Sequence, residues 1–178
     1  EVRSFAAGLG AIGVEAGSHV GLISENRKEW LVADLSILSL RAADVPRGND
    51  SMAEEIAYIL SFAGCVTVVV ENLEQLEKVL SVRGEIDKLA TLVVLDRGFS
   101  RESIDSLPKG IKLYTYQEIQ RLGEKLLATD GELVDRSIDA GDGEETATII
   151  FTSGTTGVPK GVMITHHNFL HQVSCIPD

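Results

Sequence analysis

Residues 146–165 read TATIIFTSGTTGVPKGVMIT. The opening run, residues 146–151, is apolar and β-branched, which predicts a buried strand. Residues 152–161 then combine glycines, hydroxyls and one lysine. Because glycine lets the backbone approach a ligand closely, several N–H groups of such a segment can converge on one anion. A second strand-like run, residues 162–165, follows, so the pattern predicts a phosphate-binding loop held between two strands.

The candidate phosphate ligands all lie in this loop: Thr152, Ser153, Gly154, Thr155, Thr156, Gly157, Lys160 and Gly161. Lys160 carries the positive charge and is the candidate catalytic residue. The loop is not a Walker loop, because that pattern ends in Gly-Lys-Ser/Thr and here Lys160 is followed by Gly161. A simple glycine-rich surface turn is the alternative, and the two flanking strands argue against it.

The longer run IIFTSGTTGVPKGVMITHHN, residues 149–168, resembles the phosphate-binding signature of the AMP-forming adenylating enzymes. That superfamily contains acyl-CoA synthetases, peptide-synthetase adenylation domains and firefly luciferase. The resemblance implies that ATP is a substrate and Mg²⁺ a cofactor. It also implies that the Thr152 hydroxyl shares the metal with an acidic residue further along such an enzyme.

Two further runs, LISENRKEW (residues 22–30) and DVPRGND (residues 44–50), resemble the N-terminal region of bacterial long-chain fatty-acid CoA ligases. This resemblance implies ATP, a fatty acid and CoA as substrates. The acid would be activated to an acyl-adenylate with release of pyrophosphate, and transfer to CoA would then give acyl-CoA and AMP.

Two other functions stay open. An adenylation domain that loads an amino or aryl acid onto a carrier protein would have the same loop, because the loop handles ATP and not the acid. A non-catalytic nucleotide-binding module derived from the same fold would have it too.

From residue 20 onward, short β-rich runs alternate with helical segments, which predicts an α/β fold with a doubly wound, mostly parallel sheet and helices on both faces. By resemblance, residues 1–178 are part of the large N-terminal AMP-binding domain of an adenylate-forming enzyme, with the phosphate loop at 152–161. The C-terminal domain and the remaining active-site residues are expected beyond this segment, so we expect the segment alone to be inactive.

The expected strands are residues 20–23, 66–70, 91–96, 146–151 and 162–165. The expected helices are residues 29–40, 52–63, 72–80 and 115–127. Residues 29–40 are apolar on nearly every face and predict a largely buried helix. Residues 128–145, rich in Asp, Glu and Gly, predict a solvated connector.

Local signals predict several helix ends. Ser51 with Glu54, and Thr115 with Glu118, match the capping-box pattern, and Asn72 is a candidate N-cap. Gly8, Gly10 and Gly13 match the spacing of a dinucleotide-binding fingerprint, but they precede the first predicted strand instead of following it. We therefore interpret these glycines as a helix end and a turn.

The net charge of −11 argues against nucleic acid or an anionic membrane surface as a partner. No apolar run reaches the roughly 18 residues of a membrane span. The two cysteines give no disulfide framework, and Cys65, inside an apolar run, is expected to be inert. We expect a cytoplasmic protein; long-chain acids leave open a peripheral contact at the inner membrane surface, and the oligomeric state is open.

The histidines are not expected to be catalytic. His166 is expected to pack or cap at the start of the last helix. His167 and His171 are four residues apart and can share a helix face, but the sequence offers no third metal ligand near them.

Overall fold

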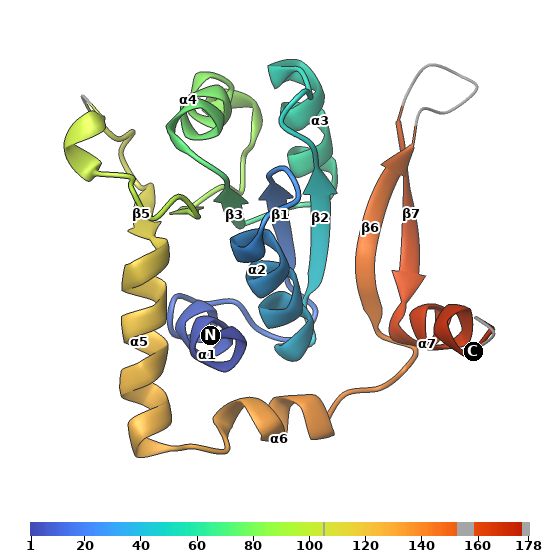
Figure 1. Ribbon diagram of the computed structural model, residues 1–178. Helices are drawn as coiled ribbons and strands as arrows, with labels where there is room; N and C mark the ends of the chain where they lie inside the picture. The colour runs from blue at the N-terminus through green and yellow to red at the C-terminus, as the bar shows by residue number, and fades with distance from the viewer. Residues whose placement is uncertain (105, 153–158, 176–178) are drawn as a thin grey trace.

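The computed structural model describes residues 1–104, 106–152 and 159–175 (Figure 1). The strands are β1 (His19–Ile23), β2 (Ala43–Arg47), β3 (Thr67–Val70), β4 (Thr91–Val94), β5 (Lys112–Thr115), β6 (Thr146–Thr152) and β7 (Lys160–Thr165). The helices are α1 (Val2–Ala11), α2 (Lys28–Ser39), α3 (Ala53–Phe62), α4 (Leu73–Ser81), α5 (Tyr116–Thr129), α6 (Leu133–Asp139) and α7 (His166–Ser174). Two 3-10 turns are η1 (Arg83–Glu85) and η2 (Arg101–Ser103).

Over the described residues these strands form one seven-stranded sheet in the order β5-β4-β3-β1-β2-β6-β7. All neighbours from β5 to β6 run parallel, and β7 alone runs antiparallel, against β6. The predicted α/β fold with a mostly parallel sheet is therefore confirmed. Since β1 lies between β2 and β3, the winding reverses beside β1, and sheets of this kind bind ligands at the carboxyl ends of strands near such a reversal.

Two apolar cores cover the two faces of the sheet, which confirms the predicted helices on both sides. One core joins the sheet to α3 and α4, and the other joins it to α1, α2 and α5. The strands supply both cores by alternation: Val68 and Val70 of β3 pack in the first core, and Val69 packs in the second.

The contact between α1 and α5 depends on two glycines. A Cβ atom built at Gly8 would lie 2.0 Å from the backbone oxygen of Ile119, and one built at Gly123 would lie 1.7 Å from that of Ser4. Gly8 lies inside α1 and not at its end, whereas Gly10 lies in the last turn of the helix, as expected. Gly13, with φ of 103°, does form the turn that follows the helix.

One predicted capping box is absent and one is present. The N-cap of α3 is Met52, with no side-chain capping bond, because the Ser51 hydroxyl instead accepts a hydrogen bond from Arg47 Nε at 3.2 Å. At α5 the Thr115 and Glu118 box is complete. Asn72 caps α4 as predicted, accepting from the backbone N–H of Gln75.

Four other segments differ from the sequence-based expectation. Helix α2 is buried on one side only, with Leu31 51% and Leu35 41% exposed. The predicted connector 128–145 contains α6, whose Val134 is buried. Strands β2 and β5 were not predicted; β2 carries Pro46, which argues locally against a strand inside a sheet.

Within the described part of the chain no helix is long and apolar enough to cross a membrane. Cys65 is fully buried, as expected, and burial raises the pKa of its thiol to about 12. Its reactive thiolate form is therefore disfavoured.

Candidate phosphate-binding site

The hairpin of β6 and β7 brings two predicted site residues together. Strand β6 runs parallel to β2 and ends at Thr152, at the same edge of the sheet as the carboxyl ends of β1 and β2 (Figure 1). In the antiparallel ladder Thr152 pairs with Lys160, and Phe151 pairs with Gly161. The proposed metal-binding hydroxyl and the proposed phosphate-binding lysine therefore start from neighbouring backbone positions.

The other predicted ligands divide into two groups. Ser153, Gly154, Thr155, Thr156 and Gly157 lie outside the described residues. Gly161 lies in β7, where an added Cβ would come within 3.0 Å of Ile149 Cγ2 and 3.1 Å of Phe151 Cζ. Close packing beside the Phe151 ring is thus a sufficient reason for glycine at position 161.

Arg47, at the end of β2, is a site residue that the sequence reasoning did not single out. Its Nη1 donates to the backbone oxygen of Phe151 at 3.3 Å, and its Nε donates to Ser51 Oγ. Its Nη2 forms an ion pair with Glu55 of α3. The only sequence signal was its place in the DVPRGND run.

Helix α3 holds the other end of the loop. The Tyr58 hydroxyl donates to the backbone oxygen of Pro159 at 3.3 Å. One turn further, the Phe62 ring meets the Phe151 ring edge-on, with centroids 5.9 Å apart. Both chain ends that flank residues 153–158 are therefore in contact with α3.

The amino end of β6 is also joined to the β2 region by an arginine. Arg41, just before β2, donates from Nε to both carboxylate oxygens of Glu145 at 3.0 Å. The hydrogen bonds from Arg41 hold the pKa of Glu145 below its usual value. Arg41 has a φ of 60°, a backbone conformation uncommon outside glycine.

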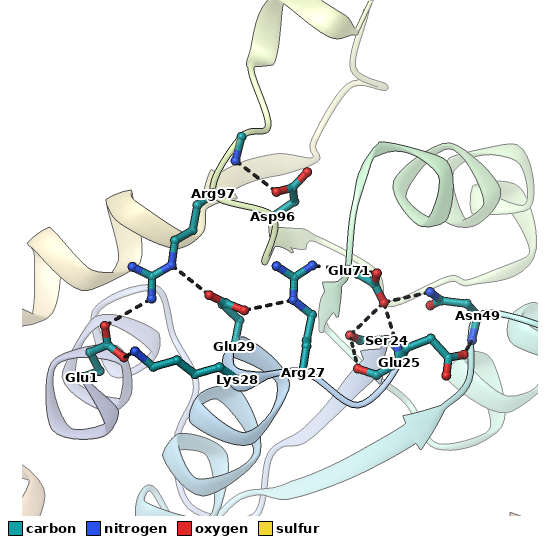
Figure 2. A network of polar contacts seen from close by, with 11 residues as sticks. Glu1, Ser24, Glu25, Arg27, Lys28, Glu29, Asn49, Glu71, Asp96 and Arg97 are labelled. Carbon is teal, nitrogen blue, oxygen red and sulfur yellow. Dashed lines mark hydrogen bonds and ion pairs between the residues drawn. The ribbon is translucent and has the colours of Figure 1, made fainter.

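A polar network lies at the carboxyl ends of β1 and β3 (Figure 2). Glu71 Oε2 accepts hydrogen bonds from Ser24 Oγ, from the backbone N–H of Glu25 and from Asn49 Nδ2, at 3.1, 2.8 and 2.8 Å. Burial alone would raise the pKa of Glu71, but these bonds and the nearby Arg27 outweigh it and lower the pKa. The network ties the loop after β1 to the loop after β2, beside Arg47.

The same network continues toward the amino terminus (Figure 2). Glu29 accepts from Arg27 Nε at 3.0 Å and from Arg97 Nε at 2.9 Å, and Arg97 also contacts Glu1 at 3.2 Å. These carboxylates are all engaged by protein groups, so this part of the network serves to hold the loops in place.

A pocket of about 480 Å³ lies on the α2 side of β2 and β6. It is lined by Trp30, Asp34, Leu38, Asp44, Pro46, Thr148, Ile150, His166, Phe169 and Leu170. Asp44 and Thr148 are register partners, and among the described residues Asp44 Oδ1 and Thr148 Oγ1 have no hydrogen-bond partner. Burial raises the pKa of Asp44 to about 7, with a further contribution from Asp34, whose own pKa is raised by burial to about 6.

The described residues contain no cluster of three His, Cys, Asp or Glu side chains able to hold a metal ion. His166 lies at the start of α7, as expected, but it does not cap that helix: the cap is Thr165, together with Asn168. His167 Nδ1 lies 2.9 Å from Glu144 Oε1. Thr152 is therefore the predicted Mg²⁺ ligand among the described residues. A single protein ligand suits this ion, because Mg²⁺ bound to phosphates commonly keeps several waters and takes few protein ligands.

Relatives of known name match nearly the whole chain. The chain is 36% identical over 177 residues to a chloroplastic long-chain-fatty-acid–acyl-carrier-protein ligase of Arabidopsis thaliana. This match covers 97% of the present chain and 24% of the ligase. The chain is also 32% identical over 168 residues to a long-chain-fatty-acid–CoA ligase of Xenopus laevis, covering 94% of this chain and 21% of that one. The chain therefore spans about a quarter of the length of the curated relatives it matches.

Among solved structures, the fold is similar to that of an anthranilate CoA ligase in complex with anthranoyl-AMP. The TM-score is 0.71 at 21% identity, over 97% of this chain and 30% of the other. This similarity supports the fold alone. The model of the family described as AMP-binding enzyme matches residues 1–177. The chain belongs to the AMP-binding enzyme family.

Proposed function

We propose that this chain is the N-terminal part of a ligase that activates a long-chain fatty acid with ATP. The acid carboxylate would attack the α-phosphorus of ATP and break its bond to the bridging oxygen, so that pyrophosphate leaves and an acyl-adenylate forms. A thiol sulfur would then attack the acyl carbon, releasing AMP and giving a thioester. The observation that carries the proposed activation by ATP is the family match over residues 1–177, and the names of the relatives support a long-chain fatty acid as the substrate.

The roles proposed for individual residues follow from the charges in this reaction. Both reactants are anionic, so catalysis depends mainly on neutralising charge and fixing positions. Lys160 would contact the departing β- and γ-phosphates, and loop N–H groups and hydroxyls would bind their oxygens. Thr152 would contribute a ligand to Mg²⁺, which supplies charge neutralisation at the phosphates when bound.

Two thiol acceptors are supported by relatives, CoA and acyl-carrier protein. The relative at 36% identity is named as an acyl-carrier-protein ligase, and that at 32% as a CoA ligase. We propose CoA, because the ISENRKEW and DVPRG runs resemble CoA ligases, and we keep acyl-carrier protein as the second candidate. A cytoplasmic location remains part of this proposal.

The test is ATP–pyrophosphate exchange by the full-length protein without any thiol, over acids from acetate to long fatty acids and including amino and aryl acids. We expect exchange to peak on long fatty acids, and thioester to form when CoA is then added. A peak on amino or aryl acids would contradict the proposed fatty-acid substrate. Thioester formation with acyl-carrier protein but not with CoA would contradict CoA as the thiol acceptor and favour acyl-carrier protein. ATP binding without exchange on any acid would favour a non-catalytic module.

A further inference from the structure

We infer that Arg47 is a positioning residue for the phosphate-binding loop. Its guanidinium fixes the point where the chain leaves β6 relative to β2, and thereby the position of the Thr152–Lys160 pair relative to the rest of the sheet. The inference rests on the proposed function, since it assigns Arg47 an effect on the binding of ATP phosphates.

The pairing between β2 and β6 explains why a side chain is needed at this point. In the described part of the sheet the two strands share one register pair, Asp44 with Thr148. Three residues further along each strand, Arg47 and Phe151 are joined by the bond from Arg47 Nη1 to the Phe151 backbone oxygen. The side chain therefore replaces the backbone ladder where β6 ends.

The guanidinium of Arg47 is itself held firmly. Each of its three nitrogens has a partner: Nε donates to Ser51 Oγ, Nη1 to Phe151 O, and Nη2 to Glu55. The side chain is 21% exposed and that of Glu55 is 33% exposed. A planar fork of donors can satisfy three directions at once, whereas a lysine ammonium at the end of a flexible stem has no such fixed geometry.

One face of α3 supports both ends of the loop. Glu55, Tyr58 and Phe62 are spaced three and four residues apart, so they lie along the same side of the helix. Glu55 holds Arg47, Tyr58 binds the Pro159 backbone oxygen, and Phe62 packs edge-on against the Phe151 ring. The carboxyl end of β2 and this helix face thus fix where the chain enters and leaves the loop.

Arg41 provides a matched control within the same pair of strands. It also bridges to β6, but at the amino end, through Glu145. A lysine at position 41 would disturb the attachment of β6 to the sheet at the end away from Thr152. Comparison of the Arg41 and Arg47 variants therefore separates a weaker attachment of β6 to the sheet from a displacement of the phosphate-binding loop.

The experiment compares Arg47→Lys, Tyr58→Phe and Arg41→Lys with the parent in the full-length protein. ATP–pyrophosphate exchange gives kcat and the KM values for ATP and for the acid, calorimetric titration with pyrophosphate gives a dissociation constant, and a melting curve monitors folding. We expect Arg47→Lys to raise the KM for ATP and the Kd for pyrophosphate about tenfold or more, and to leave the KM for the acid within twofold of the parent value. An effect of this size is reasonable, because a misplacement of substrate-positioning groups by about 1 Å can cost 100-fold in rate. Tyr58→Phe should shift the same constants in the same direction by less.

Arg41→Lys should leave the ATP and pyrophosphate constants within twofold. If Arg47→Lys changes them no more than Arg41→Lys does, or raises the KM for the acid equally, the assignment of Arg47 is overturned. A parent that binds pyrophosphate but exchanges with no acid would refute the proposed reaction alone, and the titration would still decide the role of Arg47. A parent that neither exchanges nor binds ATP or pyrophosphate would refute both.

Discussion

Thr152 and Lys160 are register partners in the antiparallel ladder of β6 and β7. They are eight residues apart in sequence, and the hairpin brings them together at the carboxyl edge of the sheet. A hydroxyl and an ammonium group thereby start from adjacent backbone positions, which is what the proposed roles of Thr152 toward Mg²⁺ and of Lys160 toward phosphate oxygens require.

Replacement of Lys160 by alanine should impair adenylation without unfolding the protein. The side chain is exposed, so its loss removes little packing. Loss of one charged group at developing phosphate charge should lower the exchange rate on the order of 100-fold. Exchange kinetics of the full-length protein measure this, with Lys125→Ala, an exposed lysine on α5, as the control. A rate within twofold of the parent would remove Lys160 from the mechanism.

Asp44 should make stability depend on pH. Its pKa is about 7 in the folded protein and near 4 when unfolded, so between these values the folded state binds more protons. The contribution of Asp44 is therefore most favourable below pH 4 and is lost as pH rises through 7. The Asp44→Asn variant does not suffer this loss. The difference in the free energy of unfolding, variant minus parent, should therefore increase by on the order of 3 kcal/mol from pH 4.5 to pH 8.

Urea denaturation at the two pH values tests this dependence on Asp44. Asp139→Asn, at an exposed position on α6, is the control and should show little change with pH relative to the parent. A constant difference between Asp44→Asn and the parent across the range would contradict the raised pKa of Asp44.

The glycines of α1 should respond in opposite ways to alanine. Gly8→Ala would force a methyl group against the Ile119 backbone, so we expect a loss of about 3 kcal/mol in the free energy of unfolding. At Gly10 the nearest atom to an added Cβ is Leu40 Cδ2 at 3.8 Å, and alanine there should gain about 0.5 kcal/mol. Chemical denaturation of both variants checks this; equal effects would mean that α1 and α5 are not in such close contact.

Of the two capping-box patterns, only the Thr115 and Glu118 box, which forms in the structure, should contribute to the free energy of unfolding. Thr115→Ala removes the cap of α5 and should lower the free energy of unfolding by about 1 kcal/mol. Thr115→Ser keeps a hydroxyl and should restore most of it. Glu54→Ala, in the pattern that forms no box, should stay within about 0.5 kcal/mol of the parent. Thermal or urea unfolding compares the three, and a loss of about 1 kcal/mol for Glu54→Ala would show that the box forms in solution.

The sequence predicted the elements whose signal is local. The β-branched runs that became β3, β4 and β6 and the cap at Asn72 depend on neighbouring residues, through periodicity and side-chain to backbone bonds. The glycine-rich run from Thr152 likewise carried its phosphate-binding signal in its own composition. These features determined the fold class and the first candidate ligands.

Tertiary structure decided the features that depend on distant partners. Pro46 argues locally against a central strand, yet β2 forms because β1 pairs with it over five residues. Ser51 matches a cap but binds Arg47 instead. Arg47 and Phe151 are 104 positions apart, and no local pattern shows that they meet. The sequence alone thus predicted where a phosphate could bind, and long-range pairing and packing decided which residues contact the two strand ends that flank this predicted loop.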